Sequence, residues 1–326
     1  MQKINEHLRM ILDKLPEAPG VYEFLGEQGE ILYVGKSKCL RRRVQSYFVP
    51  NPAWEKAKRM VPRIRDIRIT VTDTHLEAML LECEKIKRIL PYYNTMMKHD
   101  RSYIYLTLEA DARRKPLKIT PEREETSFGP FRRKRRLEET MDALRNLYPI
   151  VRSERGYAFG YHIFPAELSK EMFSQNRKAL EAIFSSEKET ALFCSELELL
   201  MKEAVEREQY ERALKYRDLA ENLRKISKQL ARYQGWQNEM LIYGVPMQDG
   251  YRLFLIREGQ VIGVETAPDF AEQTRNLFAR RVLFESERQR EISMPDDKEL
   301  LDYRDIVWTE LSAADPELVV YTGKEL

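Results

Sequence analysis

Short apolar runs alternate with turn-like residues in the first hundred positions. GVYEFL at 20–25 and ILYVGK at 31–36 are rich in aromatic and β-branched residues, and the stretch GEQGE between them predicts a β-hairpin. Residues 38–47 lack Pro and Gly, so we expect a helix directly after the second strand. IRITVT at 67–72 predicts a third strand, and residues 75–90 predict a helix closed by Pro91. Residues 1–100 are therefore expected to form a small α/β domain.

Three further segments follow in the pattern. YIYLTL and PLKIT predict strands, and residues 137–147 predict an amphipathic helix, within a connecting region at 101–195. Residues 196–233 have no Pro or Gly and carry apolar positions at helical spacing, which indicates a helical hairpin turning near Glu208. MLIYGV, YRLFLI and QVIGVET predict three strands, followed by a helix at about 270–284, so residues 234–326 are expected to form another α/β unit.

The positions of the positively charged residues suggest nucleic acid as a partner. The formal net charge is only +2, but cations cluster in KSKCLRRR at 36–43 and in RRKRR at 132–136. Clustered cations are typical of contacts with the phosphates of nucleic acid, although a solvated charge run is an equal alternative for the second cluster. The residues that we expect to contact DNA are Lys38, Arg41, Arg42, Arg132, Arg133, Lys134, Arg135 and Arg136.

The spacing of the cysteines and the hydropathy of the chain bear on its metal sites, its disulfides and its location in the cell. Cys39, Cys83 and Cys194 lie far apart, so neither a zinc site nor a disulfide framework is indicated. The N-terminal residues carry charges throughout, and no run approaches the roughly 18 apolar residues of a membrane span. We expect a cytoplasmic protein without a membrane partner.

The candidate chemistry lies in the first hundred residues. Tyr22 and Tyr33 are predicted on partner strands of the hairpin and could be cross-strand neighbours. Arg43 and Tyr47 are one helical turn apart and share a helix face. Glu82 sits in the apolar helical run AMLLECEKI, where a carboxylate needs a reason to be present.

These groups match the needs of phosphodiester hydrolysis. The reaction requires a base for the nucleophile and positive charge on the phosphate oxygens. A tyrosine can act as the base only if cations favour its phenolate, and Lys36 and Arg43 are available. Glu82 could hold one divalent ion, with water filling the other positions. The ordinary alternatives are half-buried strand tyrosines and an exposed helix carboxylate.

Three blocks, PGVYEF, LYVGKSKCLRRRVQSYF and EAMLLECEKIKRILPYYN, resemble the GIY-YIG nuclease domain in its UvrC subfamily. The resemblance implies a three-stranded antiparallel sheet with flanking helices. It implies that Tyr33 is the general base and Tyr22 its supporting hydroxyl. The resemblance assigns the phosphate to Lys36, Arg43 and Tyr47, one Mg²⁺ or Mn²⁺ ion to Glu82, and a site-stabilising role to Asn94.

The resemblance continues through most of the chain. LLMKEAVEREQYERALKYRDLAENL is similar to the UVR motif, the helical hairpin through which UvrC meets UvrB, although any two-helix element has such apolar and charged positions. It implies a UvrB-type helicase subunit as partner, bound through Tyr210, Ala213, Leu214, Arg217 and Asp218. The last strands resemble the start of the RNase H-like second nuclease of UvrC, and no counterpart of its site or of the helix-hairpin-helix module follows before Leu326.

One departure concerns the region after YPI at 148–150. UvrC proteins usually carry a small cysteine cluster there, whereas VRSERGYAFGYHIFPAEL has none, so no iron-sulfur cluster is expected. The shortened plan is similar to Cho, a UvrC-homologue nuclease, although the UVR-like hairpin is a UvrC feature.

Together these features lead us to expect a metal-dependent, structure-specific endonuclease. It would make one single-strand incision in damaged double-stranded DNA, on the 3′ side of the lesion, during UvrB-dependent nucleotide excision repair. Two alternatives remain open: a noncatalytic adaptor that binds DNA or UvrB, and a GIY-YIG nuclease with a non-repair target.

Overall fold

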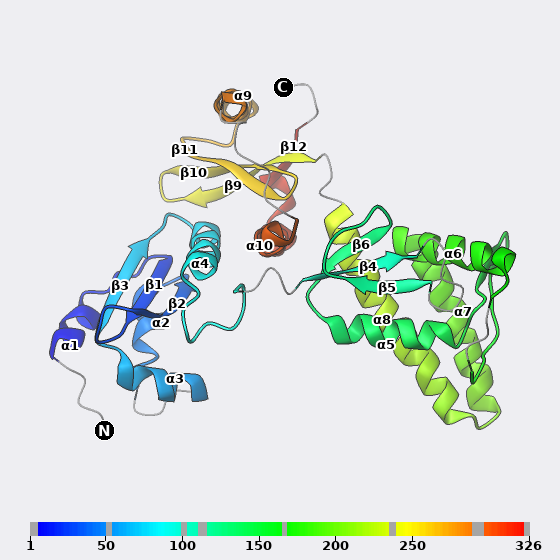
Figure 1. The fold of residues 1–326 in the computed structure, drawn as a ribbon. Coiled ribbons are helices and arrows are strands. Elements are labelled where there is room, and N and C mark those ends of the chain that lie inside the picture. The colour runs from blue at the N-terminus through cyan, green and yellow to red at the C-terminus, as the bar shows by residue number, and fades with distance from the viewer. Residues whose placement is uncertain are drawn as a thin grey trace. The chain divides into compact units, whose positions relative to one another are not determined.

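The computed structural model describes residues 6–49, 54–98, 103–109, 116–164, 168–234, 239–288 and 297–322. Its contacts define two compact units: Met1–Asp100 together with Asn238–Leu326, and Arg101–Gln237. Both units mix helices with antiparallel sheets (Figure 1). The expected mixed α/β fold class is confirmed.

The first unit begins with a three-stranded antiparallel sheet, as expected. Its strands β1 (Gly20–Leu25), β2 (Ile31–Ser37) and β3 (Asp66–Val71) lie in the order β2-β1-β3. Tyr22 is paired with Gly35, and Tyr33 with Phe24, so the two tyrosines are diagonal neighbours rather than direct partners. The helices are α1 (Glu6–Asp13), α2 (Leu40–Gln45), α3 (Glu55–Met60) followed by the 3₁₀ turn η1 (Val61–Arg63), and α4 (His75–Ile89).

Helices cover both faces of this sheet. Val21 and Val34 pack against α4 through Ala78 and Ile86. The opposite face carries Tyr22 and Phe24 and belongs to a larger cluster, which also contains Leu8, Leu40, Val44 and Met60. Every residue of β1 is buried as a result, including Glu23, whose carboxylate pairs with the Lys85 ammonium at 3.1 Å.

Helix α4 is fixed at its start and along its outer side. Thr74 and Glu77 form a capping box, in which each side chain accepts a hydrogen bond from the other residue's backbone N–H. The Glu77 carboxylate also accepts from the Arg252 guanidinium at 2.7 Å, and the Lys87 ammonium lies 3.0 Å from the Asp302 carboxylate. Arg252 and Asp302, which lie far from α4 in the sequence, therefore form ion pairs with this helix.

Those partners belong to the C-terminal part of the first unit. Strands β9 (Met240–Met247), β10 (Gly250–Arg257), β11 (Gln260–Ala267) and β12 (Val319–Tyr321) form an antiparallel sheet in the order β11-β10-β9-β12, with α9 (Glu272–Arg288), α10 (Asp297–Ala313) and the turn η3 (Pro316–Leu318). The three predicted strands and their turns are confirmed, and Gly250 and Gly259 have the positive φ that these turns require. The RNase H-like resemblance of this segment stays a prediction.

The second unit combines small sheets with four helices. Strands β4 (Ile104–Leu108), β5 (Leu117–Thr120) and β6 (Ser127–Phe131) form a sheet in the order β5-β4-β6, and β7 (Val151–Ser153) pairs with β8 (Gly156–Ala158). The helices are α5 (Lys134–Arg145), α6 (Lys170–Ser185), α7 (Glu187–Glu206) and α8 (Tyr210–Gln234). The predicted hairpin is α7 with α8, and its turn is at Glu208, which has a φ of 56°.

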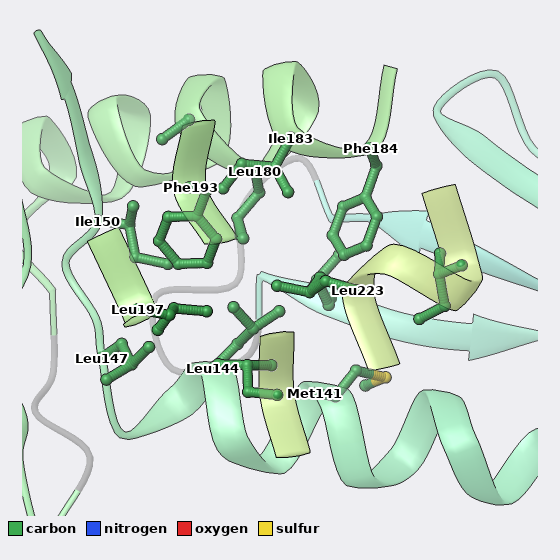
Figure 2. Packing of buried hydrophobic residues seen from close by; sticks show 14 of the residues in the cluster. Met141, Leu144, Leu147, Ile150, Leu180, Ile183, Phe184, Phe193, Leu197 and Leu223 are labelled. Atoms are coloured by element: carbon green, nitrogen blue, oxygen red, sulfur yellow. The ribbon is translucent and has the colours of Figure 1, made fainter. Parts of the chain in front are cut away.

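One hydrophobic core joins these helices. Figure 2 shows Leu144 of α5, Leu180 of α6, Phe193 of α7 and Leu223 of α8 packed against one another. Residues 101–195 and 196–233, which the sequence presents as a connecting region and a hairpin, share this core. None of the described helices combines the length and apolar character needed to cross a membrane.

The capping box should contribute measurably to stability. We expect Thr74→Ala to lower the free energy of unfolding by about 1 kcal/mol, because the Glu77 backbone N–H loses its acceptor. Thr74→Ser keeps the hydroxyl and serves as the control. Urea unfolding of the three proteins measures the difference, and equal stability of the alanine and serine variants would contradict the assignment.

A charged cluster in the second unit gives a pH dependence. The Glu189 carboxylate accepts from Arg152 Nε at 2.6 Å and from the Tyr157 hydroxyl at 2.6 Å, and these bonds lower its pKa to about 2. A lowered native pKa stabilises the fold above the ordinary value of 4.5, and this contribution is lost as the pH falls toward 2. We therefore expect the stability gap between wild type and Glu189→Gln to narrow as the pH is lowered. Chemical unfolding at several pH values measures the gap, and a constant gap would argue against this cluster.

Candidate active site

The outer edge of β2 is hydrogen-bonded by side chains and by one loop instead of by another strand. The Val34 N–H donates to Asn94 Oδ1 at 3.0 Å, and Asn94 Nδ2 donates to the Val34 carbonyl at 2.9 Å. The Lys36 N–H donates to Glu82 Oε1 at 3.1 Å, and the Leu32 carbonyl accepts from a backbone N–H of the loop after α4. Buried peptide groups need such partners, so Asn94 and Glu82 both maintain the shape of this strand.

Gly35 sits between these bonded positions and allows two tyrosines to approach the strand. A Cβ at this position would meet the hydroxyl of Tyr22 and lie 2.8 Å from the ring of Tyr33. No other residue type fits without moving a tyrosine. This requirement is missing from our candidate residues, because the backbone approach becomes visible only when the strands are paired.

Three tyrosines gather on the α2 side of the sheet. The rings of Tyr22, Tyr33 and Tyr47 lie with centroids 5.9 to 6.2 Å apart, and the hydroxyls of Tyr22 and Tyr47 are 2.8 Å apart. Burial raises the pKa of both Tyr22 and Tyr47, so each stays a neutral phenol that donates or accepts a hydrogen bond. Tyr33 is only partly buried, which leaves it as the tyrosine of this cluster with access to solvent.

Glu82 reaches the site from the other side of the sheet. It belongs to the stripe Ala78, Glu82 and Ile86 that α4 turns toward β1 and β2, and it is 9% exposed. Burial raises the pKa of its carboxyl, while the charge and backbone N–H of Lys36 and the charge of Arg43 oppose that rise. A cation beside this carboxyl would stabilise its charged form.

Arg43 links the two sides. The strand register puts Tyr33 on the face that α2 covers, whereas Glu82 comes from the helix on the opposite face. The charge of Arg43 nevertheless lowers the pKa of Tyr22 and Tyr47 and also that of Glu82. Arg43 therefore influences both the phenols on one face of the sheet and the carboxylate that comes from the other face.

The donor set suits one hard divalent ion. Glu82 Oε1 is occupied by the Lys36 N–H, and Oε2 accepts no hydrogen bond from the residues that the structure describes. Those residues also include no group of three acidic, histidine or cysteine side chains that could enclose a metal. Magnesium typically binds one or two carboxylates and completes its shell with water and substrate phosphates, so a single free carboxylate oxygen fits it.

The expected DNA contacts near this site differ in their surroundings. Lys38 is exposed, and Arg42 donates to the Cys39 thiol at 3.4 Å. Arg41 donates to the Leu15 carbonyl at 2.7 Å, which ties it to the loop before β1. Lys38 and Arg42 are therefore exposed, whereas Arg41 is only partly exposed.

The remaining expected residues lie in the second unit. The basic run Arg132, Arg133, Lys134, Arg135 and Arg136 spans the start of α5, where Lys134 and Arg135 pair with Glu138 and Glu139. On α8, Tyr210 and Leu214 are 65% and 47% exposed, and the side chains of Arg217 and Asp218 are exposed and paired with each other. Ala213 is buried in the core of the unit.

One further aromatic residue belongs to the site and is absent from our candidate residues. The Trp54 ring lies 4.0 Å from the Arg43 guanidinium carbon and 5.5 Å from the Tyr47 ring. The sequence offered only a weak signal, a tryptophan directly before a basic stretch. The contact of Trp54 with Arg43 exists only because the fold brings α2 close to the start of α3.

Comparisons with known proteins agree with the motifs in the sequence. Residues 18–95 match the model for the UvrC-like GIY-YIG domain, and residues 194–226 match the UvrB/UvrC motif. UvrABC system protein C of Desulfitobacterium hafniense (strain Y51) is 31% identical over 271 residues, which covers 79% of this chain and 44% of that protein. The same protein of Acinetobacter baylyi is 31% identical over 328 residues, which covers 90% of this chain and 54% of that protein.

A solved domain is also similar in sequence. The GIY-YIG N-terminal endonuclease domain of UvrC from Thermotoga maritima, bound to its catalytic divalent cation magnesium, is 36% identical and covers 28% of this chain and 100% of that one, with a TM-score of 0.27. The chain spans about half the length of the curated relatives it matches. Residues 18–95 are therefore a UvrC-like GIY-YIG domain and residues 194–226 a UvrB/UvrC motif, in a chain that is similar to UvrC along most of its own length.

Proposed function

We propose that this protein is a metal-dependent DNA endonuclease that makes one single-strand incision, on the 3′ side of a lesion, in nucleotide excision repair. A UvrB-type partner would deliver it to damaged double-stranded DNA in the cytoplasm. The observation that carries the proposal is the position of Arg43, whose charge acts both on the tyrosine cluster and on the buried Glu82 carboxylate that bonds to the Lys36 N–H of β2. The match of residues 18–95 to the UvrC-like GIY-YIG domain supports the proposal.

The chain's own groups divide the work. Tyr33, in its phenolate form, takes the proton of the attacking water, and the neutral hydroxyls of Tyr22 and Tyr47, which are hydrogen-bonded to each other, lie beside it. Lys36 and Arg43 neutralise the phosphate oxygens as charge develops. A Mg²⁺ or Mn²⁺ ion at Glu82, when bound, supplies further positive charge at the scissile phosphate. Asn94 acts as a positioning residue, because it holds Val34 next to Tyr33.

Two other functions compete with this one. A noncatalytic adaptor would need only binding surfaces, yet the site keeps a buried, metal-compatible carboxylate with a raised pKa, which is costly to maintain. A nuclease with a non-repair target would have no use for the UvrB/UvrC motif at 194–226. Both remain outcomes of the experiments below.

The decisive test is an incision assay on an end-labelled, lesion-bearing duplex with UvrB and magnesium. We expect one nick in the damaged strand, and its position reports the side of incision. Glu82→Gln should reduce the rate by about a hundredfold or more, because it removes the charge that holds the ion but keeps an oxygen for the Lys36 N–H. Chelation of the metal should have the same effect.

A surface carboxylate two positions away gives the matched control. Glu84 is exposed and pairs only with Arg88 among the described residues, so Glu84→Gln should cut at the wild-type rate. Unchanged incision by folded Glu82→Gln would remove Glu82 from the site. Absence of a nick with wild-type protein would favour the adaptor.

The partner surface can be tested separately. Leu214 is exposed on α8 beside Tyr210, one helical turn away, so a charge there should weaken hydrophobic docking of a UvrB-type helical hairpin. We expect Leu214→Glu to lower capture by UvrB about tenfold or more, the scale of an interface hot spot. Leu277→Glu, at an exposed leucine of α9, is the control for the added charge. Equal binding of both variants would place the partner elsewhere.

A further inference from the structure

Trp54 has an unusual environment for a large aromatic residue. It is 46% exposed, and its ring covers the guanidinium of Arg43 at 4.0 Å. Arg43 also lies 5.1 Å from the centre of the Tyr47 ring. Two aromatic rings thus contact the cation that the proposed function assigns to the scissile phosphate.

These aromatic contacts take the place of an ion pair. Within the described part of the chain, Arg43 has no carboxylate at ion-pairing distance, and its neighbour Arg41 shows the contrast by bonding to the Leu15 carbonyl and to Glu17. An ion pair or a carbonyl would occupy the N–H groups at the rim of the guanidinium. Stacking uses only its flat face, so the N–H groups that are not directed at the Tyr22 hydroxyl stay available for phosphate oxygens.

The tryptophan is itself held in place. Its backbone carbonyl accepts hydrogen bonds from the N–H groups of Ala57 and Lys58 in the first turn of α3. Its ring meets the buried Tyr47 edge to face, with an interplanar angle of 86°. The start of α3 therefore presents a fixed aromatic surface to a long and otherwise mobile side chain.

We infer that Trp54 is a positioning residue for incision, which holds the Arg43 guanidinium by stacking and aims its N–H groups at the scissile phosphate. This inference rests on the proposed function of the site. It assigns to Trp54 an action through Arg43, with no direct contact to DNA. Loss of the ring should then slow the cleavage step while DNA affinity stays within about twofold, since phosphate contacts elsewhere dominate binding.

The stack itself can be measured without any cleavage. With Trp236 and Trp308 replaced by Phe, Trp54 is the sole tryptophan of the chain, and its emission reports the adjacent cation. We expect Arg43→Ala to change the intensity and wavelength of this emission. Arg63→Ala, at an exposed cation of the turn after α3, should leave it unchanged. Emission that ignores Arg43 would overturn the inference.

Cleavage variants then test the consequence. In single-turnover incision, Trp54→Leu should slow the chemical step about five- to tenfold, and Trp54→Phe, which restores a ring, should stay within about threefold of wild type. In an Arg43→Lys background the same leucine change should have almost no further effect, because a lysine cannot use a flat stack in this way.

The outcomes separate the two proposals. Equal rates for the leucine and phenylalanine variants, or a full leucine effect in the Arg43→Lys background, would overturn the role of Trp54. A leucine variant with weakened DNA affinity and an unchanged cleavage step would show direct base contact instead. If the wild-type protein makes no nick at all, the proposed function fails, whereas the emission experiment still decides whether Trp54 holds Arg43.

Discussion

Peptide groups on the outer edge of β2 need hydrogen-bond partners, although no strand in the described part of the chain lies beside them. Asn94 satisfies Val34 in both directions, and Glu82 satisfies Lys36. Residues that the proposed chemistry uses are therefore also residues whose side chains bond to this strand. Gly35, between these two positions, has room for no side chain because the tyrosines fill the space above it. Three consecutive residues of this edge strand, Val34, Gly35 and Lys36, thus contact Asn94, the tyrosines and Glu82 in turn.

This double use explains how well the sequence predicts the site and where it fails. Tyr22 and Tyr33 could be selected because they lie in two short runs that read as the paired strands of a hairpin. Glu82 could be selected because it is a carboxylate in an apolar helical run. The partner of Val34 lies 60 positions away, and no local pattern encodes such a bond. The importance of Trp54 and Gly35 likewise becomes visible only from contacts with residues that other strands and helices bring close. The helix α3 has only six residues, which is too few to show a helical period in the sequence. The sequence predicts that the hairpin begins at residue 196, whereas α7 begins at Glu187, directly after Ser186 at the end of α6.

The helical hairpin shows a different limit of sequence reasoning. Its periodicity correctly predicts two helices and a turn, but cannot tell which apolar positions face the domain and which face outward. In the structure Ala213 lies in the core of the second unit, whereas Leu214 beside it is exposed. One face of the hairpin is therefore committed to internal packing with α5 and α6, and only the remainder of its surface is available to another protein.

The contact between Arg252 and Glu77 joins residues 175 positions apart, with the whole second unit between them in the chain. At the ribosome, where synthesis proceeds at about 5–20 residues per second, this separation corresponds to roughly 9–35 s. During that interval the N-terminal sheet and α4 exist without Arg252 and Asp302, and the second unit can complete its own core first. The Arg252 and Asp302 side chains can therefore pair with α4 only after the second unit has been synthesised.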